Sequence, residues 1–369
     1  MTDTRIDKLA DLLVNYSVTV RPGDKVIIRG ETIAEPLLKA IYTRVVKAGG
    51  HPTMMAELPG LDELLFRTAS DDQLKYIHDW QRDIISTYDV QISIIAEHNT
   101  KALTNIDPTK MGTYSQGRRE LSEIVLRRSA AKELLWTVAL FPTAAYAQDA
   151  EMSLSEYEDF VYNACMPDLD DPVTYWRNIS AWQQKIVDWL QGKKTVHING
   201  PETDLRMSIA GRPFENCDGR YNMPDGEIFT SPVEDSIDGT VYFSYPAIYR
   251  GHEITGVRLK FEEGKVVEAA AEKNEEFLLK ILDTDEGSRR VGEFAIGTNK
   301  GITRFTRQIL FDEKINGSFH MALGLGFPET GSQNQSAIHW DLICDLRGGG
   351  AIWVDDELLY KNGEFVIQF

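Results

Sequence analysis

Several features that mark common protein classes are missing from this chain of 369 residues. It holds only three cysteines, and they show no CxxC spacing, which argues against a disulfide framework or a thiolate zinc cage. No GxGxxG or Walker loop follows any apolar run, so nothing marks a nucleotide site. No run of about 18 apolar residues is present that could span a bilayer, so we expect no membrane partner.

Positive charge is also scarce. The chain has 39 Lys and Arg against 57 Asp and Glu, a formal net charge of −18, and no local stripe of basic residues offsets it. Such a surface repels nucleic acid, so we expect no nucleic-acid partner. The first 18 residues predict an amphipathic helix without the apolar region or cleavage site of a signal peptide, so we expect a cytoplasmic protein.

The length predicts two domains, because single hydrophobic cores stop growing near about 250–300 residues. In the first half, strand patterns at residues 24–30, 51–57 and 90–97 and an apolar run at residues 136–141 alternate with helical patterns, which lie at residues 34–48 and 116–135. Strands that alternate with helices are typical of an α/β fold with a parallel sheet. We therefore predict an N-terminal α/β domain with a largely parallel sheet.

The sequence pattern changes after a long helical segment at residues 173–191. From residue 195 onward the pattern is mostly short β segments, with Gly and Asp gathered between them as antiparallel hairpins require. We place the boundary between residues 192 and 193. The prediction is an N-terminal domain over 1–192 and an α+β, mostly antiparallel C-terminal domain over 193–369.

The last fifty residues carry the clearest chemical signal. His339 and Asp341 are two apart in QSAIHWDLICD, and on a strand such residues project from the same face. His320 precedes them in FHMALGLGF, and the whole chain has only seven histidines. Imidazole nitrogens and carboxylate oxygens are ligands of borderline divalent metals, so these residues predict a metal site.

Two glutamates lie in apolar, Gly-bounded segments that are unusual for surface acids. Glu227 lies in MPDGEIFTSPVED and Glu293 in VGEFAIGTNKGI. A buried carboxylate needs an ion partner, a metal or a shifted pKa. Purely structural roles stay open: Glu227 could neutralise Arg220, and Glu293 could pair with Lys300 or Arg290. For the histidines, His320 could be a core residue, and His339 could hydrogen-bond Asp341 on a surface strand.

The segments GEIFTSPVEDSIDGTV, VGEFAIGTN, FHMALGLGFPETG and QSAIHWDLI, in this order, resemble the motifs of the aminopeptidase T family, the thermophilic metallo-aminopeptidases. The resemblance implies a cytosolic, homodimeric, two-domain enzyme that hydrolyses peptides with two divalent ions (Zn, Co or Mn) per subunit in its C-terminal domain. By position, the resemblance implies the metal ligands Glu227, Glu293, His320, His339 and Asp341.

The chemistry of that ligand set is consistent with hydrolysis. Two ions roughly 3.5–4 Å apart can hold a hydroxide and polarise a scissile carbonyl, provided that carboxylates bridge them. We expect Glu293 to be a bridging ligand and the catalytic acceptor of the water's proton. One residue departs from the family pattern: Phe327 stands where family members commonly carry a tyrosine, and a phenyl ring cannot donate a hydrogen bond to an oxyanion.

Two other functions remain open. His320, His339 and Asp341 alone would form the facial triad of a mononuclear iron dioxygenase that opens dihydroxypyridine rings. Glu227 and Glu293 favour two metals over one, because a single iron does not need them. Phe327 also leaves room for a catalytically inactive homologue on the same fold.

Overall fold

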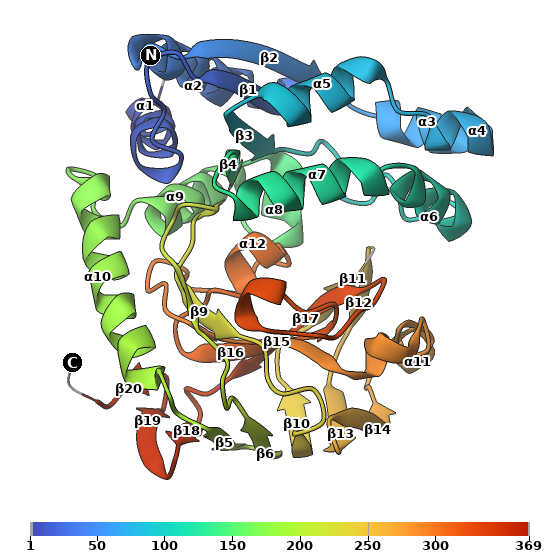
Figure 1. Ribbon diagram of the computed structural model, residues 1–369, viewed down its shortest axis with the longest axis vertical. Coiled ribbons are helices and arrows are strands. Elements are labelled where there is room, and N and C mark those ends of the chain that lie inside the picture. Colours follow the sequence, from blue (N-terminus) through green and yellow to red (C-terminus); the bar gives the residue numbers. More distant parts are fainter. Residues whose placement is uncertain (1–2, 250, 368–369) are drawn as a thin grey trace. The chain divides into compact units, whose positions relative to one another are not determined.

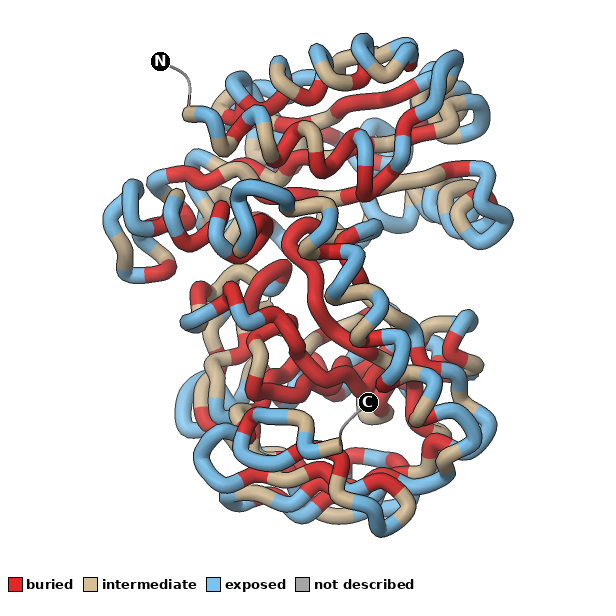
Figure 2. The backbone as a smooth tube through the Cα atoms, turned by 90° about the vertical axis from the view of Figure 1, so that its left-hand side faces the viewer, coloured by how far each residue is buried: buried red, intermediate tan, exposed pale blue. Residues whose placement is uncertain are grey.

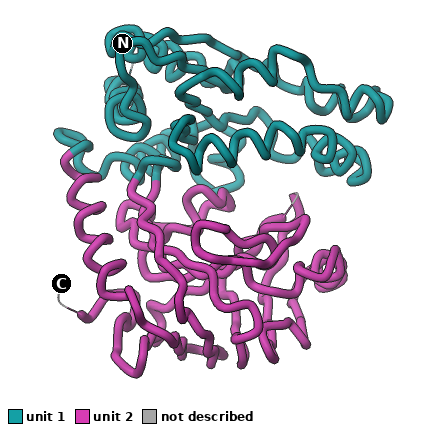
Figure 3. The backbone as a smooth tube through the Cα atoms, in the orientation of Figure 1, with its two compact units in different colours: residues 1–173, 219–224 teal, residues 174–218, 225–369 magenta. Residues whose placement is uncertain are grey.

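The computed structural model describes residues 3–249 and 251–367, and its internal contacts divide the chain into two compact units (Figure 3). The first unit comprises residues 1–173 and 219–224, and the second comprises residues 174–218 and 225–369. The units part near the start of helix α10 (Pro172–Leu190), because this helix contributes Ile186 and Leu190 to the core of the second unit. The domain boundary between residues 192 and 193 stays a prediction.

The first unit is built on one parallel sheet, as the alternation of strands and helices predicted (Figure 1). Its strands, in spatial order, are β2 (His51–Glu57), β1 (Lys25–Glu31), β3 (Val90–Ile95), β4 (Leu135–Leu140) and β8 (Asn222–Met223). In β1, consecutive residues Val26, Ile27 and Ile28 are all buried. A strand that is apolar on both faces is typical of a parallel sheet covered by helices on both sides.

The helices of this unit precede or connect the strands of the sheet. They are α1 (Thr4–Leu12), α2 (Glu35–Lys47), α3 (Leu61–Thr68), α4 (Asp71–Lys75), α5 (Asp79–Thr87), α6 (Pro108–Gly117), α7 (Arg119–Ala130), α8 (Ala144–Asp149) and α9 (Leu154–Cys165). Helix α2 buries Leu37, Leu38, Ile41 and Val45, which recur at helical spacing and form its apolar face. Within the described residues, no helix combines the length and the apolar character needed to cross a membrane.

The second unit is antiparallel, in agreement with the predicted hairpins. Its eight-stranded sheet has the order β14 (Lys265–Ala270), β13 (Val257–Glu262), β10 (Asp238–Phe243), β6 (Thr203–Ser208), β5 (Thr195–Gly200), β18 (Ala351–Val354), β19 (Glu357–Lys361) and β20 (Glu364–Phe365). Its five-stranded sheet has the order β17 (His339–Asp345), β16 (Ser318–Gly324), β15 (Val291–Gly297), β9 (Glu227–Thr230) and β7 (Glu215–Cys217). Strands β11 (Ala247–Tyr249) and β12 (His252–Ile254) form a separate hairpin, and the helices α11 (Glu275–Leu282) and α12 (Ile309–Asp312) complete the unit.

One apolar core joins the two larger sheets of this unit. Phe294, Phe319 and Leu342 from the five-stranded sheet share a cluster with Leu205 and Phe243 from the eight-stranded sheet. Strands β15 and β16 are buried along their whole length, so both faces of the five-stranded sheet are covered there. Figure 2 shows the buried stretches of the chain in red. Because side chains alternate along a strand, the residues between these apolar ones project to the opposite face.

The entry into β17 is fixed by one aspartate. Asp285 caps the short 3₁₀ helix Glu286–Arg289 and also reaches across to the segment before β17. Its carboxylate accepts hydrogen bonds from the Ala337 backbone N–H at 2.7 Å, the Ser336 hydroxyl at 2.8 Å and the Ser288 N–H at 3.0 Å. Burial alone would raise the pKa of Asp285, but these hydrogen bonds hold it below its usual range.

We expect Asp285→Ala to lower the free energy of unfolding by about 1–2 kcal/mol at pH 7, because it leaves these N–H and O–H donors without their acceptor. A carboxyl group with a lowered folded-state pKa stabilises the fold above its unfolded pKa, about 3.9, and loses this effect as the pH falls through the folded value. The difference between variant and parent in urea unfolding should therefore shrink near pH 3. Glu276→Ala, on the exposed face of α11, serves as the control and should change little at either pH. An equal loss for both variants would contradict the role of Asp285.

Candidate metal centre

The five residues singled out in the sequence lie on neighbouring strands of the five-stranded sheet. Glu227 begins β9, Glu293 lies on β15, His320 on β16, and His339 and Asp341 on β17. Antiparallel pairing places the four strands side by side in the order β17-β16-β15-β9. Side chains separated by up to 114 positions along the chain are therefore brought onto one surface of one sheet.

The strand register explains how the acids line up. Ala322 on β16 pairs with Glu293 on one side and with Asp341 on the other, so these three residues form one row across the sheet. His320 precedes Ala322 by two positions and therefore projects from the same face. A register shift between Val291 and Glu293 marks a β-bulge, a feature often found beside functional sites. The small Ala322 side chain leaves space between the two carboxylates.

Each imidazole faces several carboxylates through its Nε2 atom. His320 Nε2 lies 3.5 Å from Glu227 Oε2, 3.6 Å from Glu293 Oε1 and 4.0 Å from Asp341 Oδ1. His339 Nε2 lies 3.2 Å from Glu293 Oε2 and 3.6 Å from Asp341 Oδ1. Glu293 thus directs one oxygen to each imidazole, which is the position that a bridging carboxylate requires.

The backbone fixes the orientation of both rings. His320 Nδ1 lies 2.9 Å from the Glu313 carbonyl oxygen, and His339 Nδ1 lies 2.8 Å from the Leu325 carbonyl oxygen. A carbonyl oxygen can only accept, so each Nδ1 carries a hydrogen and donates it. Metal-binding histidines are commonly held in this way, with the other nitrogen directed to the metal.

The side chains of this cluster are largely shielded from solvent. Glu227, Glu293 and His320 are all at most 6% exposed. Glu227 Oε2 and Asp341 Oδ1 are buried without a hydrogen-bond partner among the described residues, although both lie within ion-pair distance of an imidazole. Orphaned carboxylate oxygens are costly unless they receive a cation or a donor. The residues present therefore fit divalent metal ions.

The charges in this cluster shift one another's proton affinity. Burial raises the pKa of Glu227 to about 8, with Lys314 offsetting part of the effect, and burial raises the pKa of Asp341 to about 6. Burial alone would lower the pKa of His320, but its hydrogen bond to Glu293 and the nearby carboxylates raise it to about 10. The same opposition raises the pKa of His339 to about 10. The cluster attracts positive charge strongly.

Two residues beside the cluster were missed in the sequence. Glu313 can present a carboxylate oxygen within 4.8 Å of ligand atoms of His320 and Asp341. Lys314 is fully buried, with its Nζ 3.7 Å from Glu227 Oε1 and in contact with the Glu313 carboxylate. A signal was present: the charged run Asp312-Glu313-Lys314 stands between the apolar residues Leu310-Phe311 and Ile315, shortly before His320. Cys217 and Asp225 also approach Glu227 to within the same distance.

The alternative partners proposed for Glu293 are engaged elsewhere. Lys300 pairs with Glu364 at 3.2 Å, and Arg290 donates to the Glu234 backbone carbonyl at 2.9 Å. The partner proposed for Glu227, Arg220, falls in the segment assigned to the first unit. The carboxylate of Glu227 instead faces His320 and Lys314 within its own unit.

Phe327 lies next to the cluster. Its ring centroid is 5.2 Å from that of His339 and 5.3 Å from that of Phe229, both in edge-to-face geometry. Two tyrosines of the second unit, Tyr245 and Tyr360, carry hydroxyls that Phe327 lacks. The hydroxyl of Tyr245 contacts Arg347, and Tyr360 packs in the core against Phe365. Neither hydroxyl has a hydrogen bond to the five-residue cluster in the described part of the chain.

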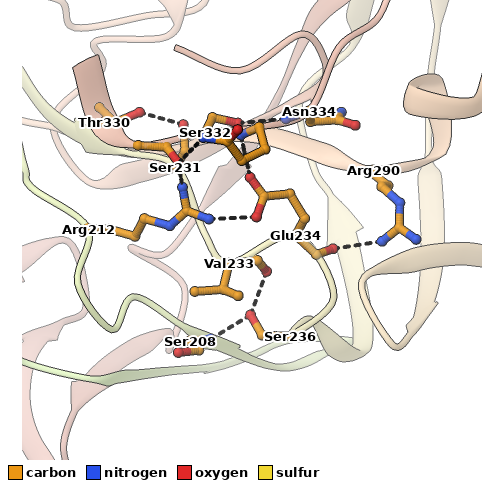
Figure 4. A network of polar contacts seen from close by, with 12 residues as sticks. Ser208, Arg212, Ser231, Val233, Glu234, Ser236, Arg290, Thr330, Ser332 and Asn334 are labelled. Carbon is orange, nitrogen blue, oxygen red and sulfur yellow. Dashed lines mark hydrogen bonds and ion pairs between the residues drawn. The ribbon is translucent and has the colours of Figure 1, made fainter. Parts of the chain in front are cut away.

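A partly buried ion pair between Arg212 and Glu234 holds the loop at residues 325–338 that supplies Leu325 and Phe327 (Figure 4). Arg212 donates to Glu234 Oε2 at 2.5 Å and also contacts the Gly331 carbonyl oxygen. Glu234 Oε1 in turn accepts from the Gln333 backbone N–H at 2.6 Å. Asn334 donates to the Gly324 carbonyl oxygen at 2.6 Å, which joins the loop to the end of β16. The network thus holds the loop next to Leu325, whose carbonyl oxygen accepts from His339.

Comparison with known proteins gives a consistent picture. Residues 2–365 match the family described as thermophilic metalloprotease (M29). Aminopeptidase 2 of Geobacillus stearothermophilus is 26% identical over 98% of this chain and 91% of its own length. Aminopeptidase T of Thermus aquaticus is 26% identical over 97% of this chain and 95% of its own length.

Two solved structures share the fold. Wild-type AmpT from Thermus thermophilus superposes with a TM-score of 0.86 at 22% identity, over 99% of both chains. A 2,5-dihydroxypyridine dioxygenase from Pseudomonas putida superposes with a TM-score of 0.58 at 13% identity, over 100% of this chain and 99% of the other. At these identities the likeness establishes the architecture, an N-terminal α/β part followed by a largely antiparallel part.

The raised pKa of both histidines predicts proton release on metal binding. At pH 7 the two imidazoles are protonated in the metal-free protein, and a metal needs the Nε2 lone pair of each. Binding of divalent metal should therefore release about two protons or more, and the apparent affinity should rise with pH up to about 10. Calorimetric titration with Zn²⁺ in buffers of different ionisation enthalpy measures this release. His51→Gln, on β2 of the first unit, is the control, and binding without proton release would contradict the assignment.

Proposed function

Because the chain belongs to the thermophilic metalloprotease family, we propose that it is a metal-dependent aminopeptidase that removes N-terminal residues from peptides. Its curated relatives over nearly the whole length carry the name aminopeptidase. The observation that carries the proposal is the convergence of Glu227, Glu293 and Asp341 on two oriented imidazoles, with two buried carboxylate oxygens unpaired in the described chain. A site of this composition suits hydrolysis through bound metal.

We further propose that two divalent ions (Zn, Co or Mn) occupy this site in each subunit. The proposed ligands are Glu227, Glu293, His320, His339 and Asp341, with Glu313 as a sixth candidate. Glu293 belongs to two of the ligand groups, one with Glu227 and His320 and the other with His339 and Asp341. A carboxylate shared by two groups is what a dinuclear centre needs, so Glu293 is the proposed bridge.

When bound, the ions would supply Lewis acidity toward the scissile carbonyl and lower the pKa of a bound water. The chain's own residues supply the rest. The Glu313 and Leu325 carbonyl oxygens hold both imidazoles with Nε2 toward the carboxylates. Glu293 accepts the proton of the attacking water in this proposal, because it is the carboxylate between the two ligand groups.

The dioxygenase alternative has weaker support. A single iron would be bound by His320, His339 and Asp341. The buried Glu227 and the neighbouring Glu313 would then coordinate no metal. Glu227 is buried with its Oε2 atom lacking a hydrogen bond among the described residues, which is costly without a further cation. The similarity to the dihydroxypyridine dioxygenase concerns the fold alone.

We also propose the assembly and location that the family resemblance implies, a homodimer in the cytoplasm. Residues 193–369 form the proposed catalytic domain, because all five ligand candidates fall within this range. Size-exclusion chromatography with light scattering would measure the dimer directly.

Hydrolysis of aminoacyl-anilides tests the activity. Purified protein supplied with Co²⁺, Zn²⁺ or Mn²⁺ should release the anilide, and a chelator should abolish the release. Glu293→Gln should lower kcat by about 10²–10⁴-fold, the usual contribution of a general base, while the circular dichroism spectrum stays unchanged. Glu276→Gln, an exposed acid on α11, controls for loss of one negative charge. A chain without turnover of any peptide would be the inactive homologue, and a normal rate in Glu293→Gln would remove this residue from the mechanism.

Metal stoichiometry separates the two enzymatic alternatives. Elemental analysis after dialysis against metal should find about two ions per chain, and Glu227→Gln should reduce this to about one. One tightly bound iron per chain, unaffected by Glu227→Gln, would favour the dioxygenase instead.

A further inference from the structure

Lys314 is a buried cation beside the candidate metal centre, and the proposed mechanism gives it no role. The residue is 0% exposed, although lysine is among the residue types least often buried. Its Nζ atom lies 3.7 Å from Glu227 Oε1 and also contacts the Glu313 carboxylate. Burying an ion pair is costly and adds little stability, so an ammonium group in this position indicates a role in the site.

The chain around Lys314 is fixed by its backbone. The residue closely follows α12, and its carbonyl oxygen accepts a hydrogen bond from the Asn299 N–H at 3.1 Å. The preceding residue, Glu313, accepts the Nδ1 hydrogen of His320 through its own carbonyl oxygen. Two consecutive residues therefore hold two ligand candidates. One holds His320 through a backbone oxygen, and the other holds Glu227 through an ammonium group.

The two carboxylate oxygens of Glu227 have different surroundings. Oε1 faces the ammonium group of Lys314. Oε2 lies 3.5 Å from His320 Nε2 and has no hydrogen-bond partner among the described residues. Because Oε1 is already paired with a cation, Oε2 is the oxygen that remains for a metal ion. Glu293 differs in this respect, since it directs one oxygen to each of the two imidazoles.

Lys314 also adds positive charge to one part of the cluster. Although burial alone would lower its pKa, the charges of Glu227 and Glu313 raise the pKa above its ordinary value, so the side chain is an ammonium ion. Two ligand groups share Glu293, and the ammonium group is paired with the group that contains Glu227. Like charges repel strongly across a few ångströms of poorly solvated interior, so Lys314 opposes the binding of an ion in that group.

We propose that Lys314 is a positioning residue that holds Glu227 as a one-oxygen ligand and makes the ion bound through Glu227 the more weakly held of the two. This inference rests on the dinuclear centre of the proposed function. The ion held by Glu293, His339 and Asp341 binds first, and the second ion binds only at a higher metal concentration. Lys314 thus sets the concentration of divalent metal at which the centre fills.

Titration of the metal-free protein with Co²⁺ in competition with a chromophoric chelator measures the affinity of each ion without an activity assay. We expect the parent to bind two ions with unequal affinity. Lys314→Met should tighten the weaker ion by about tenfold or more, because it removes a nearby like charge and frees Glu227 Oε1. Lys314→Arg keeps the charge and should leave the weaker ion within about threefold of the parent. Lys280→Met removes an exposed charge on α11 and should bind both ions as the parent does.

Glu227→Gln shows through which ligand Lys314 acts. This variant should lose the weaker ion and keep the tighter ion at parental affinity. In the same background, Lys314→Met should leave the tighter ion unchanged, because its effect requires the Glu227 carboxylate. Circular dichroism checks that each variant folds. If Lys314→Met does not fold, the parent, Lys314→Arg and Glu227→Gln still decide the assignment.

Three results would contradict the role of Lys314: two ions of equal affinity in the parent, loss of the tighter ion in Glu227→Gln, or a folded Lys314→Met that binds the weaker ion no more tightly than the parent. The last result is the one expected of a purely structural lysine. A parent that binds no divalent ion overturns the metal centre itself, and this inference with it. Two bound ions that do not respond to Lys314→Met overturn this inference alone and leave the proposed function intact.

Discussion

The apolar packing between the two large sheets of the second unit is the interaction on which the candidate centre depends. Phe294, Phe319 and Leu342 fill one face of the five-stranded sheet and contribute to a core shared with the eight-stranded sheet. Because side chains alternate along a strand, burying these residues directs Glu293, His320 and Asp341 to the other face. A register slip of one residue would bury the charges in the apolar core, so the hydrophobic contacts specify the polar site.

The cluster that results is electrostatically demanding. Glu227 and Asp341 keep buried oxygens without hydrogen bonds among the described residues, and Lys314 is the fully buried cation beside Glu227. The neighbouring carboxylates raise the pKa of His320 and His339, which favours protonated, positively charged imidazoles when no metal is bound. The same carboxylates that make the cluster costly to bury give it affinity for divalent cations. This combination indicates a functional site.

Much of this arrangement follows from short-range sequence patterns. The alternation of helices and strands predicted the parallel sheet, and the period-2 pattern around His339 and Asp341 placed both on one strand face. Glu227 and Glu293 were predicted as metal ligands from the order of the motifs shared with the aminopeptidase T family, because no local spacing links them to the histidines. Glu313 and Lys314 were missed because charged residues between turns usually belong to the solvated surface, and the burial of Lys314 arises only from the packing of the second unit. The pairing of β8 with β4 joins positions more than eighty residues apart and has no local signal.

That last strand has a consequence for how the protein is made. The first unit is formed by two separate segments, residues 1–173 and 219–224. Strand β8 belongs to the second segment, so it is added to the parallel sheet after the other four strands have been synthesised. A ribosome that has released the first 173 residues has delivered four strands with the outer edge of β4 still uncovered, and an open edge invites pairing with other chains. Completion of the N-terminal fold therefore waits until the chain has been synthesised past residue 223, well into the sequence of its neighbour.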